Sequence, residues 1–172
     1  MQQTLLALVA ILVFSFFALA QHGAKADAEQ FAITAEVEFA AQRLARQRLA
    51  TVLALDFDEA DVGVARARTS PTGLSALGPD DGILSEVDES QYDDVDDFQG
   101  VRRALTTKWM DESIAFFDSV SVHYVDPATL TPVPGPSMAK EVTVIVRAAP
   151  TGFVGTPEIA ATLNQIVTPT SN

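Results

Sequence analysis

The chain has 172 residues, and its 11 Lys and Arg against 23 Asp and Glu give a formal net charge of −12. This charge argues against nucleic acid as a partner, because phosphate contacts require clustered Lys and Arg. Cysteine is absent, which excludes disulfides, thiolate metal sites and cysteine nucleophiles. The length suits one folded domain behind an N-terminal helix.

The first element is a strongly apolar segment, in which only Ser15 interrupts the run from Leu5 to Ala20. About 20 apolar residues are enough to cross a bilayer as a helix. No basic residue precedes this run, as a secretory signal would require, so we favour a retained anchor or assembly helix. Cleavage after Ala18-x-Ala20 is the alternative. The large apolar side chains that would form the polymerisation surface are Leu5, Leu6, Leu8, Val9, Ile11, Leu12, Phe14, Phe16, Phe17 and Leu19.

An amphipathic segment follows at residues 24–55. Apolar residues recur there at spacings of three and four, as in Ile33, Val37, Ala40 and Leu44, or in Ala41, Ala45, Leu49 and Val52. Proline is absent before Pro71. Gly23 joins the two segments, and because glycine costs about 1 kcal/mol against alanine in a helix, we expect a kink or an unwound stretch there. The sequence thus predicts one long helix over 1–55, apolar at 1–22 and amphipathic at 24–55.

Residues 56–172 are predicted to form a loop-rich β domain. Residues 62–101 carry turn signals, and two later segments, 120–124 and 142–146, place valines at alternate positions, as half-buried strands do. Residues 114–117 are interpreted as an extension of the first strand, and residues 159–167 as an extra strand or a surface arm. The predicted fold class is therefore α+β, a long N-terminal helix followed by a small antiparallel sheet with an acidic loop.

Catalytic chemistry is not indicated. The two histidines, His22 and His123, lie far apart in the sequence, and no nucleophile elbow, phosphate loop or dinucleotide fingerprint is present. Arg102 and Arg103 follow an acidic run and are interpreted as its internal counter-charge. We therefore do not expect an enzyme.

One acidic loop has the density of oxygen ligands that Ca²⁺ prefers. Its candidate ligands are Asp93, Asp94, Asp96 and Asp97. Their spacing does not fit an EF-hand, and the simpler interpretation is a solvated or arginine-paired acidic loop. Calcium is the only cofactor that the sequence suggests.

The succession of these segments resembles the type IV pilin and pseudopilin family, in the minor-pilin type. Four stretches, taken in order along the chain, carry the resemblance: residues 41–59 at the helix exit, the acidic stretch 93–100, and the strand pair 120–126 and 140–144. Gln2-Gln3-Thr4 stands where family members usually carry a glutamate, so the N-terminus departs from the family pattern.

The resemblance implies a structural subunit of a cell-surface or extracellular helical filament. Its partners would be copies of itself, joined through the apolar helix, and the membrane would hold it before assembly. The alternative is a membrane-anchored periplasmic binding module, or a pseudopilin of a secretion system that does not form long fibres.

Overall fold

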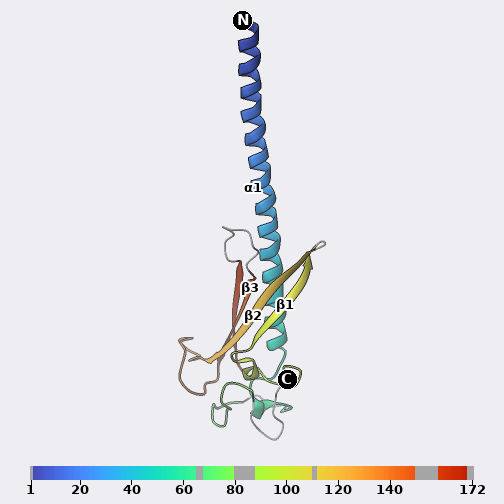
Figure 1. The fold of residues 1–172 in the computed structure, drawn as a ribbon. Helices are drawn as coiled ribbons and strands as arrows, with labels where there is room; N and C mark the ends of the chain where they lie inside the picture. Colours follow the sequence, from blue (N-terminus) through green and yellow to red (C-terminus); the bar gives the residue numbers. More distant parts are fainter. Residues whose placement is uncertain (1, 65–67, 80–87, 110–111, 150–158, 170–172) are drawn as a thin grey trace. The chain divides into compact units, whose positions relative to one another are not determined.

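The computed structural model describes residues 2–64, 68–79, 88–109, 112–149 and 159–169. A long helix, α1 (Gln2–Val52), comes first and is followed by two short 3₁₀ helices, η1 (Glu59–Asp61) and η2 (Asp96–Phe98). Four strands complete the chain: β1 (Arg102–Trp109), β2 (Glu112–Tyr124), β3 (Lys140–Ala148) and β4 (Ala160–Val167) (Figure 1). The predicted α+β class is confirmed.

Helix α1 is continuous from Gln2 to Val52, so the unwound stretch that we predicted at Gly23 is not present. A single glycine costs only about 1 kcal/mol, which the good helix formers on both sides can offset. The helix ends close to the predicted residue 55. Its last turn tightens, because the backbone N–H groups of Ala54 and Leu55 bond to carbonyls three residues back.

The contacts within the chain divide it into two compact units, Met1–Phe39 and Ala40–Asn172. The last turns of α1 therefore belong to the same unit as the sheet. They bury one helical face, made by Ala41, Ala45, Arg48 and Val52, whose spacings of three and four place them along a single stripe. The sequence had placed the domain boundary between residues 55 and 56, where the helix ends.

The sheet is fully antiparallel, in the order β1-β2-β3-β4. Its predicted alternation is confirmed: Val120, Val122, Val142 and Val144 are buried, whereas the residues between them face the other side. Strand β4 pairs with β3 along its whole length, so the described part of the tail is a strand and not a surface arm. Strand β1 was not predicted, because Arg102–Trp109 lacks the valine alternation of its neighbours.

The strand register places charged residues at both ends of the buried sheet face. Tyr124 lies opposite Lys140, and Arg103 lies opposite Asp118. Between these two pairs the buried face is formed by valines, with Val120 opposite Val144 and Val122 opposite Val142. The apolar core of this unit is thus flanked by two clusters of charge.

Candidate functional site

The ten apolar residues predicted to drive polymerisation lie on α1, and all of them are exposed. Their side chains are between 49% and 71% exposed. An 18-residue window of this helix has a mean hydropathy of 2.4, and none of it is buried. By length and composition the helix is able to cross a membrane. Large apolar surfaces of this kind mark contacts with lipid or with other proteins.

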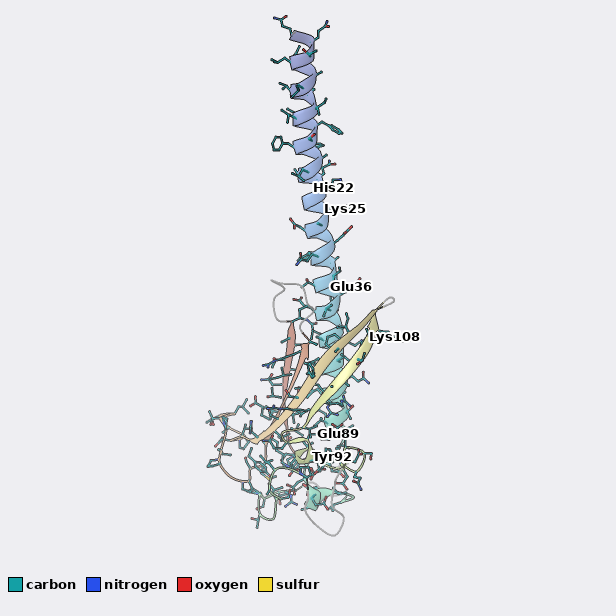
Figure 2. All side chains as sticks on the ribbon, in the orientation of Figure 1. His22, Lys25, Glu36, Glu89, Tyr92 and Lys108 are labelled. Atoms are coloured by element: carbon teal, nitrogen blue, oxygen red, sulfur yellow. The ribbon has the colours of Figure 1, made fainter. Side chains whose placement is uncertain are left out.

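The helical segment that follows is charged but also carries exposed aromatic side chains. Lys25 and Glu29 form an ion pair at 3.7 Å, one turn apart. Phe31 and Phe39 are 77% and 72% exposed. Figure 2 labels His22 and Lys25 at the junction between the apolar and the charged parts of the helix.

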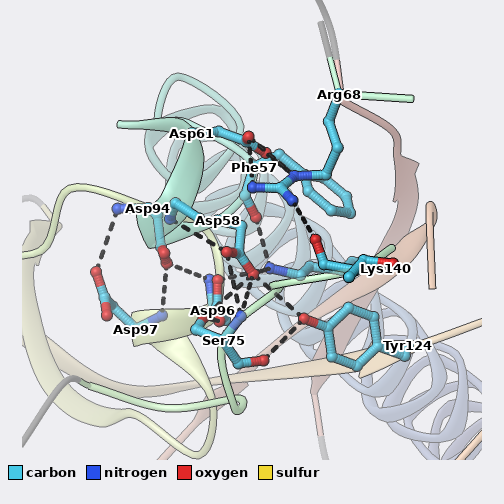
Figure 3. A network of polar contacts seen from close by, with 12 residues as sticks. Phe57, Asp58, Asp61, Arg68, Ser75, Asp94, Asp96, Asp97, Tyr124 and Lys140 are labelled. Atoms are coloured by element: carbon cyan, nitrogen blue, oxygen red, sulfur yellow. Dashed lines mark hydrogen bonds and ion pairs between the residues drawn. The ribbon is translucent and has the colours of Figure 1, made fainter. Parts of the chain in front are cut away.

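In the second unit, the Lys140 cluster consists of Phe57, Asp58, Ser75, Asp96, Tyr124 and Lys140 (Figure 3). The ammonium of Lys140 donates to Asp96 Oδ1 at 2.6 Å and to the Phe57 carbonyl at 2.5 Å, and it lies 3.4 Å from Asp58 Oδ2. Lys140 and Asp58 are fully buried, and Asp96 is 1% exposed. A lysine is almost never fully buried unless it is paired, and here every donor of the ammonium has a partner.

Two aromatic rings and one serine complete the Lys140 cluster. Lys140 Nζ lies 4.5 Å from the centre of the Phe57 ring and 5.2 Å from that of Tyr124, distances that favour cation–π attraction. Ser75 Oγ lies 2.8 Å from Asp96 Oδ2 and 3.1 Å from Asp58 Oδ2. The hydroxyl of Tyr124 is also within 3.3 Å of Asp58 Oδ2. One serine thus bridges the two carboxylates that face the lysine.

The local sequence explains how Asp58 and Asp96 reach Lys140. Asp58 caps η1 by accepting from the backbone N–H of Ala60. Residues 56 and 94 form a short parallel bridge, with the N–H of Val95 donating to the Asp56 carbonyl at 3.0 Å. This bridge joins the segment that follows α1 to the acidic loop. It thereby brings Asp58 and Asp96 next to Lys140, the first residue of β3.

The predicted calcium ligands occupy this acidic loop, but two of their carboxylate oxygens accept hydrogen bonds within it. Asp94 Oδ1 accepts the backbone N–H groups of Asp96 and Asp97, and Asp97 Oδ2 accepts those of Asp93 and Asp94. Asp93 is exposed, whereas the other three aspartates are buried. Among the described residues, no group of three or more acidic or histidine side chains is arranged to hold a metal ion.

Calcium binding at Asp93, Asp94, Asp96 and Asp97 therefore stays a prediction. A calcium titration of the melting temperature tests it, with the Asp94→Ala, Asp96→Ala double variant as the control. Calcium binding would raise the melting temperature of the parent protein alone, and the absence of any rise in the parent would remove the hypothesis.

Burial changes the acidity of two groups in this region. It raises the pKa of the Asp94 carboxyl, and the neighbouring Asp96 and Asp97 raise it further. The pKa of Tyr124 is also raised, first by burial and then by the charge of Asp58. Both shifts keep the proton on the group, so the Tyr124 hydroxyl remains a hydrogen-bond donor to Asp58.

The Arg48 cluster lies at the other end of the buried sheet face and consists of Arg48, Glu89, Phe98, Arg103 and Asp118. Arg48 donates to both oxygens of Glu89, at 2.8 and 2.6 Å, the two-pronged geometry that guanidinium and carboxylate favour. Arg103 donates to Asp118 Oδ2 at 2.8 Å. It also lies 3.7 Å from Glu89. Arg103 therefore has the predicted counter-charge role.

The guanidinium of Arg48 connects α1 to the sheet. Its Nε lies 3.6 Å from Asp118 Oδ2 on β2, and its Cζ lies 4.8 Å from the centre of the Phe98 ring. Arg48 Nε and Asp118 Oδ1 are buried and make no hydrogen bond within the described residues. The pKa of Glu89 is lowered, chiefly by the hydrogen bonds from Arg48, so this carboxylate stays ionised beside the two arginines.

Sequence reasoning missed both clusters as units. The acidic loop is a predicted site, whereas neither Arg48 nor Lys140 is a predicted site residue. One signal was available for each: Arg48 falls on the apolar stripe of Ala41, Ala45 and Val52, and Lys140 falls on the buried alternation of Val142 and Val144. A charged residue at a core position predicts a buried partner.

Comparison of the chain with protein-family models, with curated proteins and with solved structures finds no match. A long apolar N-terminal helix followed by an antiparallel sheet is compatible with a pilin-like fold. The helix is also long and apolar enough to be inserted in a membrane.

Proposed function

We propose that this chain is a structural subunit of a helical filament at the cell surface, and that it polymerises through the apolar part of α1. The observation that carries the proposal is the exposure of the ten large apolar residues named for polymerisation, from Leu5 to Leu19, and of Val13 among them. Water is a poor solvent for such a surface, so lipid or other protein must cover it. Before assembly the membrane does so, and in the filament the helices of other copies replace the lipid.

Packing between helices then supplies the driving force for assembly, because exchanging lipid for protein gains little from dehydration. Small residues allow close approach of helices, and the apolar segment contains Ala7, Ala10, Ser15, Ala18 and Ala20. At about 1.5 Å per residue, α1 is long enough to contact several neighbours in a head-to-tail array. The charge of −12 favours a soluble filament exterior.

The rival function is a membrane-anchored module that never polymerises. Both functions need an apolar helix, so a charge placed at Leu8 or Val9 disturbs both of them. A variant that stays apolar but enlarges a packing surface separates them. Ala10→Phe leaves the helix suited to lipid, whereas it overfills a closely packed helix–helix contact.

The experiment compares wild type, Ala10→Phe and Leu8→Glu by negative-stain electron microscopy and by membrane fractionation, with Leu8→Met as the matched control. We expect filaments from wild type and Leu8→Met only, with Ala10→Phe still in the membrane fraction. Wild-type material that never forms filaments, or filaments of unchanged yield from both Ala10→Phe and Leu8→Glu, would refute the proposal.

A further inference from the structure

The Lys140 cluster holds a primary amine against two carboxyl groups in a site closed to solvent. Lys140 Nζ lies 2.6 Å from Asp96 Oδ1 and 3.4 Å from Asp58 Oδ2. Lys140, Asp58 and Asp96 are each at most 1% exposed. The rings of Phe57 and Tyr124 shield the ammonium. The proposed filament function does not use this cluster.

We propose that the Lys140 cluster is a self-modification site, in which Lys140 Nζ forms an amide bond with Asp96 Cγ and releases one water molecule. The product is an intramolecular cross-link between the turn that carries η2 and the start of β3. The inference is independent of the proposed filament, because it concerns only residues of the second unit.

The reaction balances without any co-reactant. The ammonium of Lys140 first passes one proton to the Asp58 carboxylate, which leaves a neutral amine beside Asp96. Asp58 then delivers that proton to Asp96, and the amine nitrogen attacks Cγ. A second nitrogen-bound proton moves to the leaving oxygen, which departs as water when the C–O bond breaks. The third hydrogen remains on the amide nitrogen, and nothing is oxidised or reduced.

Three features of the cluster favour this reaction. The fold holds the reacting groups in contact, and such positioning is worth an effective concentration of about 10⁵ M or more in well-oriented systems. Ser75 Oγ lies 2.8 Å from Asp96 Oδ2, where it can stabilise the developing oxyanion. The amide product also replaces the charges of Lys140 and Asp96 by a neutral group, while Asp58 keeps its hydrogen bonds from Ala60, Ser75 and Tyr124.

The hydrogen bonds distinguish the roles of the two acids. Asp96 is the closer to the amine, so it is assigned as the electrophile. Asp58 is held by the backbone N–H groups of Ala60 and Ser75 and by the Tyr124 hydroxyl. These donors hold its carboxyl group within 3.4 Å of Nζ, close enough to carry a proton between the amine and Asp96.

The test is the mass of the full-length chain, purified in detergent and then denatured. We expect the wild type to be lighter than its sequence mass by one water molecule, and the tryptic digest to contain one peptide pair that joins Lys140 to Asp96. Lys140→Arg is the matched control, because it keeps the positive charge but has no amine to react, and it should show the full mass.

A second variant identifies the acid. With Asp96→Asn, the same attack would release ammonia in place of water, so this variant should not lose water. Fragmentation of the linked peptides is needed because Asp81-Gly82 is a sequence that also loses water, by forming a cyclic imide. That side reaction does not involve Lys140 and would persist in Lys140→Arg.

Two results would overturn the inference. Folded wild type at its full sequence mass would show that Lys140, Asp58 and Asp96 form only an ion-pair network. A cross-link from Lys140 to Asp58 would show that the assignment of Asp96 is wrong.

Discussion

The two units of this chain depart from the usual distribution of polar and apolar residues in opposite ways. Up to Phe39, the helix exposes large apolar side chains, from Leu5 to Leu19 and again at Phe31. From Ala40 onward, the chain buries charged side chains, including Arg48, Asp58 and Lys140. The first unit therefore exposes apolar side chains at its surface, and the second unit buries charged side chains in its interior.

The two units also differ in how these side chains are satisfied. In the second unit, buried Arg48 and Lys140 each have a carboxylate partner within the chain, Glu89 for Arg48 and Asp96 for Lys140. In the first unit the apolar window of α1 has no burial at all. The charges of these arginine and lysine side chains are stabilised within the chain, whereas the apolar side chains of the helix remain exposed.

The largest expected effect comes from breaking the Lys140 cluster. Lys140→Met prevents the proposed cross-link and leaves Asp58 and Asp96 buried without their cation, and the loss of the cation alone costs about 3–5 kcal/mol. Urea unfolding of the full chain in detergent, followed by near-ultraviolet circular dichroism, measures this cost. Lys140→Met combined with Asp96→Leu should recover part of the stability, because one uncompensated charge is then removed. A fully additive double variant would contradict the coupling.

The Arg48 cluster should give a smaller effect, because the side chain of Glu89 is 29% exposed. Arg48→Met is expected to cost about 2–3 kcal/mol, since Asp118 would remain buried with only Arg103 beside it. Arg46→Met is the matched control on the exposed face of the same helical turn, and should change stability by less than about 0.5 kcal/mol. Equal effects from the two variants would contradict a buried role for Arg48.

The pH dependence of stability tests Glu89. Its pKa is lowered in the folded chain from an ordinary value of 4.5, so the unfolded chain binds the proton more readily than the folded chain. The stability that Glu89 contributes is therefore full above pH 4.5 and is lost as the pH falls through the folded pKa. Below pH 4.5, the melting temperature of Glu89→Gln should fall less steeply with decreasing pH than that of the wild type. An equally steep fall in both proteins would exclude a stabilising contribution from ionised Glu89.

The smallest effect concerns Gly23, which lies in the first unit and has no neighbouring atom within 4 Å of an added Cβ. Gly23→Ala should stabilise the local helix by about 1 kcal/mol, while the unfolding of the second unit stays unchanged. Amide hydrogen exchange around residue 23 should slow by about fivefold. If exchange there is unaltered, then Gly23 is not the weakest point of the helix.

Much of the fold could be predicted because it follows local patterns. The spacing of three and four from Ala41 to Val52 predicts a helix with one buried face, and the alternation at Val120–Tyr124 and Val142–Val146 predicts two strands. Strand β1 escaped prediction because its polar residues, such as Thr106 and Lys108, acquire strand structure only by pairing with β2. The unwound stretch predicted at Gly23 is absent because flanking residues decide helix continuity along with the glycine itself.

The order of an apolar helix and a small antiparallel domain can be predicted from the amino-acid sequence, because periodicity and hydropathy are local properties of the chain. The meeting of Asp58, Asp96 and Lys140 depends on folding, since these residues come from the helix exit, an acidic turn and a strand. Electrostatic pairing depends on distance in space and not on separation along the chain. The partners of a buried charge therefore become visible only when the chain has folded.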